Sequence, residues 1–169
     1  KDESTVHVFI EVSSFNNFDQ TDEDGGAIHL VDCCLTCSET PFNNCQSKKG
    51  GGGAIYIENN LNLVNNITLT SLTFDNCKAA YGGAVYIYCG SKKVPVTILS
   101  CIFTGNELLQ NSDNQVDDPL RNGGKSILVI AKRGKISFCN FVKKQGSSSS
   151  TSTSSAEDMK FVSRFDEDD

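Results

Sequence analysis

The stretch FNNCQSKKGGGGAIYI, residues 42–57, decides the fold because its pattern occurs three times along the chain. Residues 15–30 read FNNFDQTDEDGGAIHL, and residues 74–87 read FDNCKAAYGGAVYI. Each copy begins with Phe-x-Asn and continues to Gly-Gly-Ala and an alternating apolar run. The repeat length is 27 residues between the first two phenylalanines (15 to 42) and 32 between the next two (42 to 74).

Two looser units extend the repeat toward the C-terminus. The fourth starts with FTGN at residues 103–106, contains a polar insertion at 107–122 and reaches GGKS at 123–126, and a fifth begins at residues 138–141. Self-similar units with a period near 30 are typical of solenoids, in which each unit buries its apolar face against its neighbours. The sequence therefore predicts an all-β protein, a right-handed parallel β-helix of about 4–5 coils.

Apolar residues alternate with other residues in the run that follows each glycine pair, as expected for strands. Ile28, Ile55 and Val85 are predicted to form one buried column, and Phe15, Phe42, Phe74 and Phe103 a second. A further apolar strand precedes each phenylalanine, so every coil should carry at least two strands, and three are expected. An antiparallel β-sandwich is the competing architecture, but it would not repeat a Phe and Gly-Gly-Ala register.

The glycine pairs are expected at turns that bend sharply into strands. Such places require positive φ or a close approach between backbones, and a larger residue should be strained there. The predicted turn glycines are Gly25, Gly26, Gly52, Gly53, Gly82, Gly83, Gly123 and Gly124.

Composition divides the chain into a repeat domain at residues 4–145 and a tail at 146–169. The tail opens with a Ser/Thr tract and ends in an acidic segment, and with little to bury it is predicted to be disordered. The alternative is that Phe161, Val162 and Phe165 fold back as a cap on the last coil, as terminal solenoid repeats often require. Because the chain begins within a predicted strand, its first coil should present an open edge, and flanking coils of a larger parent protein are expected.

Charge and hydropathy exclude several function classes. The formal net charge is -6, and the six acids in residues 156–169, against Lys160 and Arg164, contribute -4 of it. The body of the chain is therefore only slightly acidic, which argues against nucleic acid as a partner. No apolar run approaches the roughly 20 residues needed to cross a bilayer, so no membrane insertion by this chain is expected.

The repeats resemble those of the polymorphic outer-membrane proteins, which combine Gly-Gly-Ala-(Ile/Leu/Val) with Phe-x-x-Asn. Three sites match the first motif, at residues 25–28, 52–55 and 82–85, while Lys125 replaces Ala in the fourth. The second motif is intact only at residues 103–106. The resemblance, over roughly residues 5–145, implies an extracellular or cell-surface β-helix used in adhesion.

Eight cysteines are consistent with either a disulfide framework or buried thiols, and both readings stay open. Cys45 and Cys77 occupy equivalent repeat positions, as do Cys101 and Cys139, so each pair should stack on neighbouring coils. A zinc site at Cys33-Cys34-x-x-Cys37 is disfavoured, because strand alternation turns the first two side chains to opposite faces. The acids at residues 19–24 are read as a solvated turn rather than a calcium loop. No metal and no cofactor are predicted.

A non-catalytic surface module, engaged in partner interaction or serving as a structural stalk, is the predicted function. His29, Tyr56 and Tyr86 should form an aromatic surface ladder that binds a protein or glycan, or else simply stabilises neighbouring strands. The alternative function is a carbohydrate-active enzyme, a polysaccharide lyase or glycoside hydrolase, with carboxylates at Asp32 and Glu58. Asn66 begins an Asn-Ile-Thr sequon and is a candidate glycosylation site. Five basic residues form a small patch that is read either as attracting anionic glycans or as serving solubility and blocking edge pairing: Lys132, Arg133, Lys135, Lys143 and Lys144.

Overall fold

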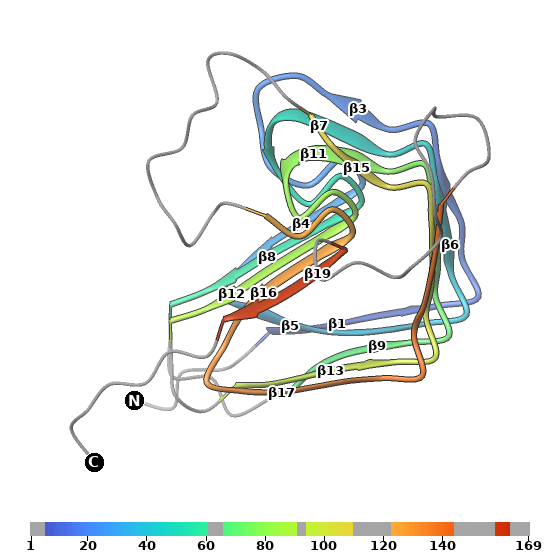
Figure 1. Cartoon of the computed structure of the whole chain (residues 1–169). Coiled ribbons are helices and arrows are strands. Elements are labelled where there is room, and N and C mark those ends of the chain that lie inside the picture. Colours follow the sequence, from blue (N-terminus) through green and yellow to red (C-terminus); the bar gives the residue numbers. More distant parts are fainter. Residues whose placement is uncertain (1–5, 61–65, 91–93, 110–122, 144–157, 163–169) are drawn as a thin grey trace.

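A computed structural model describes residues 6–60, 66–90, 94–109, 123–143 and 158–162 of the chain. These residues form a β-solenoid without helices, as the repeat predicted. Figure 1 looks along the stack of coils, so that the strands overlap in four groups, one for each side of the coil. All strand pairs are parallel and nearly all are in register, because equivalent residues of successive repeats lie side by side. No helix long and apolar enough to cross a membrane occurs in the described ranges.

Each complete coil contributes one strand to each of four parallel sheets. Sheet A stacks β1 (Val6–Glu11), β5 (Cys33–Ser38), β9 (Ile67–Thr70), β13 (Pro95–Leu99) and β17 (Arg133–Ser137). Sheet B stacks β2 (Phe15–Asn16), β6 (Pro41–Asn43), β10 (Thr73–Asp75), β14 (Ile102–Thr104) and β18 (Asn140–Val142). The coils are numbered here from coil 1, which contains β1, to coil 5, which contains β17.

Sheets C and D complete the coil. Sheet C stacks β3 (Asp19–Gln20), β7 (Gln46–Gly51), β11 (Lys78–Tyr81) and β15 (Glu107–Leu108). Sheet D stacks β4 (Ile28–Val31), β8 (Ile55–Asn59), β12 (Val85–Cys89), β16 (Ile127–Ile130) and β19 (Met159–Val162). The expectation of three strands per coil was wrong, because sheet C forms a fourth side. Its segments are polar and show no apolar alternation in the sequence, and backbone pairing between coils makes them strands.

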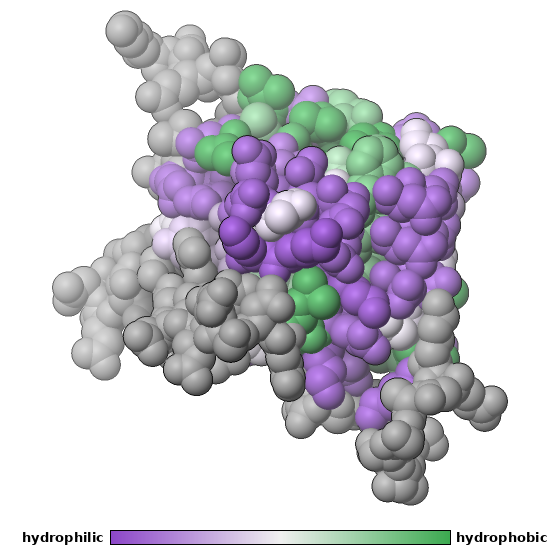
Figure 2. Space-filling view, turned by 90° about the horizontal axis from the view of Figure 1, so that it is seen from above, coloured by the Kyte–Doolittle hydropathy of each residue, from purple (hydrophilic) through white to green (hydrophobic). Residues whose placement is uncertain are grey.

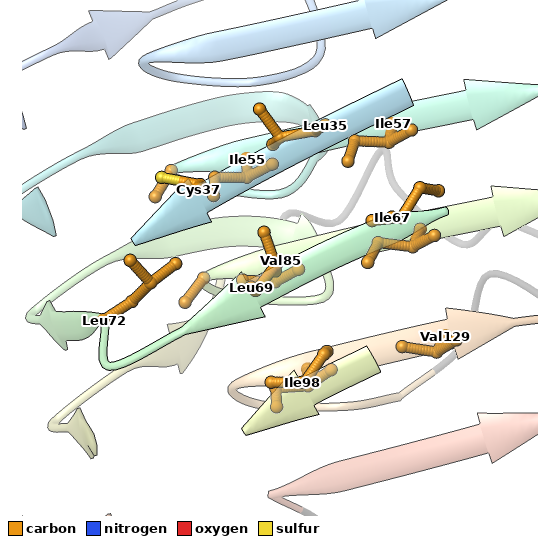
Figure 3. Close-up of a cluster of buried hydrophobic side chains, with 14 of the residues drawn as sticks. Leu35, Cys37, Ile55, Ile57, Ile67, Leu69, Leu72, Val85, Ile98 and Val129 are labelled. Carbon is orange, nitrogen blue, oxygen red and sulfur yellow. The ribbon is translucent and has the colours of Figure 1, made fainter. Parts of the chain in front are cut away.

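Both predicted core columns are present. Ile28, Ile55 and Val85 are register partners, and Ile127 continues their column. The phenylalanine rings stack face to face with centroids 4.8–5.1 Å apart and interplanar angles of 3–12°. This stack runs through Phe15, Phe42, Phe74, Phe103 and Phe141. Figure 3 shows how aliphatic side chains from sheets A and D lie together in the core, and these residues belong to the same buried cluster as the phenylalanines.

The fifth unit aligns on Phe141 rather than on Phe138. Phe138 lies at the corner between sheets A and B, with φ +56° and 87% of its surface exposed. Residues with φ between +45° and +69° mark three corners of the coil in vertical columns. These columns are Val12, Glu39, Ser71, Ser100 and Phe138; Asn17, Asn44, Asn76 and Gly105; and Gly25, Gly52, Gly82 and Gly124.

The two glycines of each pair have different roles. Gly52 adopts φ +61°, and a Cβ there would collide with the carbonyl of Ile55. Gly53 approaches the next coil, where a Cβ would lie 2.5 Å from the carbonyl oxygen and 2.7 Å from the nitrogen of Lys78. In the fourth unit the predicted alignment was one residue out. Gly83 NH donates to Gly124 O, and Ala84 NH donates to Ser126 O. Gly124 is therefore the corner glycine of this unit, Ser126 is equivalent to the alanine of the motif, and Lys125 replaces the second glycine.

The tail returns to the solenoid as β19. It pairs with β16 in parallel, so that Val129 faces Phe161 and Ile130 faces Val162. The prediction of a disordered tail was therefore wrong for residues 158–162, and the alternative of a cap is confirmed for Phe161 and Val162. The reason is the unpaired edge of β16, whose backbone groups are satisfied when Ser126 and Ile127 donate to Asp158 O at 3.0 and 3.1 Å. Phe165 lies outside the described residues.

Truncation tests this cap. Deleting residues 158–169 is expected to lower the free energy of unfolding by about 2 kcal/mol, because β16 loses its neighbour and apolar area on Leu128 and Ile130 is exposed. Deleting residues 163–169 alone is the matched control and should change little. Urea unfolding of the two truncated chains provides the comparison. Equal stabilities would show that β19 contributes nothing to the fold.

Candidate functional site

The predicted aromatic ladder exists in register but does not lie on the surface. His29 pairs with Tyr56, and Tyr56 pairs with Tyr86, with stacked tyrosine rings 5.0 Å apart. Tyr56 and Tyr86 are each only 2% exposed, however, so the prediction of an exposed ladder was wrong for both. Tyr81, at the end of sheet C, packs edge-on against Tyr86 at 4.9 Å and helps to cover it. His29, on the first coil, remains exposed.

The buried tyrosines belong to a second apolar cluster outside the main core. Its members are Tyr56, Tyr81, Tyr86, Leu128 and Ile130, and Val162 of β19 packs against it. Burial, together with a hydrogen bond to Glu58, raises the pKa of Tyr56 far above its usual value, so that its hydroxyl stays protonated and donates. The ladder therefore stabilises neighbouring strands, which was the alternative reading of these residues.

The carboxylates near this cluster are engaged in structural hydrogen bonds. The Tyr56 hydroxyl donates to Glu58 at 2.7 Å, and the Asn60 side chain donates to the other oxygen of Glu58 at 2.8 Å. Asp32 accepts a bond from the backbone NH of Asn60 at 2.8 Å. Asp24 accepts from the Tyr81 hydroxyl at 2.8 Å and from Gly51 NH at 2.6 Å. Asp32 and Asp24 thus connect their coil to later coils, while Glu58 accepts from residues of its own coil.

Two of the remaining acids of residues 19–24 pair with lysines of the next coil. Lys48 binds Asp19 at 2.9 Å, and Lys49 binds Asp22. Figure 2 views the molecule from the side of sheet C, where most of the visible described surface is hydrophilic. No group of three or more candidate metal ligands occurs in the described part of the chain, including the segment Cys33–Ser38.

All eight cysteines are free thiols in the structure. Cys45 and Cys77 follow the paired strands β6 and β10, while Cys101 and Cys139 precede the paired strands β14 and β18, so both predicted pairs stack on neighbouring coils. Burial raises the pKa of Cys37 to about 11 and that of Cys89 to about 12, which keeps both thiols protonated and unreactive at neutral pH.

The outer face of sheet A carries a regular array of hydroxyl groups that the sequence reasoning missed. One rank runs along the stack through Phe9, Thr36, Thr68, Thr97 and Lys135. A parallel rank contains Glu11, Ser38, Thr70, Leu99 and Ser137. We call these ten residues the threonine wall. Hydroxyl residues at alternate positions, Thr36 and Ser38 in β5 and Thr68 and Thr70 in β9, are the sequence signal from which it was predictable.

Aromatic and cationic groups lie at opposite ends of the threonine wall. The Phe9 ring is 68% exposed and stacks on His7 at 4.3 Å, and His7 Nε2 lies 2.9 Å from the hydroxyl of Thr36. Arg133 and Lys135 are exposed on β17 at the other end. Four inter-strand steps of about 4.8 Å separate the two ends, a length of roughly 19 Å.

Two further predicted sites can be placed but not assigned. Asn66 is exposed directly before β9, so the sequon is accessible, and its glycosylation stays a prediction. Within the predicted basic patch Lys132 is half-buried, Lys143 is exposed like Arg133 and Lys135, and Lys144 lies outside the described residues.

No protein-family model matches the chain, and neither the curated proteins nor the solved structures compared with it contain a match.

Proposed function

We propose that the protein is a non-catalytic recognition module, displayed outside a cell or on its surface, that binds an acidic glycan chain along the threonine wall. The single observation that carries the proposal is the rank from Phe9 to Lys135, which places a ring, three hydroxyls and a cation in one line.

Each part of the wall suits one part of such a ligand. An exposed ring packs on the apolar face of a sugar, and the hydroxyls of Thr36, Thr68 and Thr97 donate to and accept from its hydroxyl groups. Arg133 and Lys135 attract carboxylate or sulfate groups, and they lie on the last coil, at the opposite end of the wall from Glu11 on the first. The parallel register sets these groups about 4.8 Å apart, so an extended chain meets them in succession.

The wall is also flat and built on regular strands. Leu35, Leu69 and Ile98 alternate with the outward threonines and are fully buried, which holds the hydroxyls on rigid elements. A rigid array loses little conformational entropy when the ligand binds.

Binding to an acidic polysaccharide tests the proposal. Phe9→Ala is expected to weaken binding of hyaluronan fragments by about 1 kcal/mol, roughly fivefold in Kd, because the stacking ring is lost. Titration calorimetry measures the change. Val31→Ala is the matched control, because Val31 is 52% exposed on the outer edge of sheet D and off the wall.

Charge and salt provide the second arm of the same experiment. The Arg133→Gln/Lys135→Gln double variant should bind more weakly and lose most of the salt dependence, since screening acts on those cations. Equal binding by all variants, or tight binding of neutral dextran, would contradict the proposal.

The alternative of a carbohydrate-active enzyme predicts that the polysaccharide is shortened. The hydrogen bonds that occupy Asp32 and Glu58 favour the binding module, because a catalytic acid or base must reach the substrate. Chain shortening that disappears in Asp32→Asn or Glu58→Gln would establish catalysis instead.

A further inference from the structure

Two pairs of cysteines stack across neighbouring coils in the same way. Cys101 and Cys139 directly precede β14 and β18, whose register joins Ile102 to Asn140, and Asn140 NH donates to Cys101 O at 2.9 Å. Cys77 lies one coil above Cys45, and Lys78 NH donates to Cys45 O at 2.9 Å. Register partners in a sheet lie about 4.8 Å apart, and this spacing falls within the Cα range of disulfides.

The side chains of Cys101 and Cys139 point the same way. Each thiol approaches the carbonyl two residues earlier in its own coil, Cys101 Sγ to Leu99 O at 3.3 Å and Cys139 Sγ to Ser137 O at 3.5 Å. Each also lies near a carbonyl of the preceding coil, Cys101 Sγ at 3.8 Å from Leu69 O and Cys139 Sγ at 3.9 Å from Ile98 O. The equivalent side-chain directions and the inter-strand spacing therefore suit a bond between the two sulfur atoms.

We propose that Cys101 and Cys139 form a reversible disulfide that staples coil 4 to coil 5. The pair bridges the coil that carries Thr97 to the coil that carries Arg133 and Lys135. The staple would thus fix the last coil against the body of the solenoid, independently of whether the threonine wall binds a glycan.

The two thiols differ in access and acidity, which sets the order of the steps. Cys139 is half-buried, whereas Cys101 is fully buried. The neighbouring Cys101 thiol lowers the pKa of Cys139 to about 7, against the opposing effect of burial. The neighbouring Cys139 thiol, together with burial, raises the pKa of Cys101. At neutral pH the accessible Cys139 is therefore the thiolate and the nucleophile.

The oxidant is a low-molecular-weight disulfide, and the steps balance as two thiol–disulfide exchanges. The Cys139 thiolate attacks one sulfur of the reagent, breaks its S–S bond and releases one small thiolate. The Cys101 sulfur then attacks Cys139 Sγ in the mixed disulfide, and its proton leaves with the second small thiol. Overall the two protein thiols lose two protons and two electrons, and the reagent gains them and is reduced to two thiols.

Oxidised glutathione added to the intact reduced chain tests the proposal. Mass spectrometry of a non-reducing digest should show a peptide pair linked through Cys101 and Cys139. Because the reactive form is the thiolate and the pKa of Cys139 is about 7, the initial rate should rise about tenfold between pH 6 and pH 8.

Single variants separate the two roles. Cys101→Ser should accumulate the glutathione adduct on Cys139, because the hydroxyl keeps a polar neighbour beside the Cys139 thiolate while the resolving thiol is missing. Cys139→Ala should show neither adduct nor link at Cys101. Cys45→Ala is the matched control and should leave the link intact, because Cys45 and Cys77 are both fully buried and lie elsewhere in the stack.

Two results would overturn the proposal. One is linkage of Cys45 to Cys77 as fast as that of Cys101 to Cys139, which would mean that the greater exposure of Cys139 does not matter. The other is an absence of adduct on Cys139 in Cys101→Ser while circular dichroism shows the folded solenoid. Glycan binding is measured separately, so its failure leaves this result unaffected.

Discussion

Phe74→Ala is expected to lower the free energy of unfolding by about 3–5 kcal/mol, the range for emptying a buried aromatic site. Phe74 is fully buried at the middle of the phenylalanine stack, with its ring centroid 5.1 Å from that of Phe42 and 4.8 Å from that of Phe103. The register of β10 with β6 and β14 prevents the neighbouring rings from closing the gap. Chemical denaturation followed by circular dichroism measures the loss.

The matched control for this substitution is Ile102→Ala on the same sheet. Ile102 lies on β14 but points outward and is 44% exposed, so its truncation should cost less than about 1 kcal/mol. A loss of only 1 kcal/mol in Phe74→Ala would show that the ring stack is not the main source of stability.

Gly53→Ala is expected to cost about 3 kcal/mol, at the upper end for overpacking, because the new methyl group meets backbone rather than a side chain. It would lie 2.5 Å from the Lys78 carbonyl oxygen and 2.7 Å from its nitrogen, so coils 2 and 3 must separate. That separation lengthens the inter-coil hydrogen bonds, including Gly53 NH to Gly83 O at 3.1 Å. Thermal unfolding at a fixed heating rate reports the effect.

Gly90→Ala separates steric collision from the general effect of replacing a glycine. A Cβ at Gly90 would come no closer than 3.3 Å to the ends of the Asn60 and Tyr88 side chains, which can move. Its stability should change by less than about 0.5 kcal/mol. Similar losses of stability in Gly53→Ala and Gly90→Ala would show that the close approach of Gly53 to the Lys78 backbone does not require a glycine.

The columns of the solenoid were predictable from the sequence because a parallel stack repeats its chemistry at each coil. Phe42 and Phe74 recur in equivalent motifs, so their alignment gives the register directly. The corner position was predictable from the first glycine of each pair for the same reason. The fourth unit is the exception, because its corner residue is the second glycine, Gly124, and Gly123 precedes it.

Other features depend on contacts that a periodic pattern does not contain. Alternation places Tyr56 and Tyr86 on the outer side of sheet D, but whether an outer side chain is exposed depends on what covers it, here Tyr81 of sheet C. The strands of sheet C were not predictable from the sequence, because they lack apolar alternation, as Lys48 and Lys49 in β7 show. The return of residues 159–162 to sheet D follows a Ser/Thr tract that has no periodicity.

The axial direction of the hydrogen bonds determines how this molecule bears a mechanical load. The strands run around the stack and pair only with coils above and below, so tension applied along the axis pulls directly on the inter-coil bonds. Because the force breaks the bonds between one pair of coils before the next, we expect the solenoid to unfold and lengthen coil by coil rather than in a single event. A released coil of 27–32 residues adds roughly 90–110 Å of extended chain. A Cys101–Cys139 link would remove one of those steps and make the C-terminal end the stiffer part of the rod.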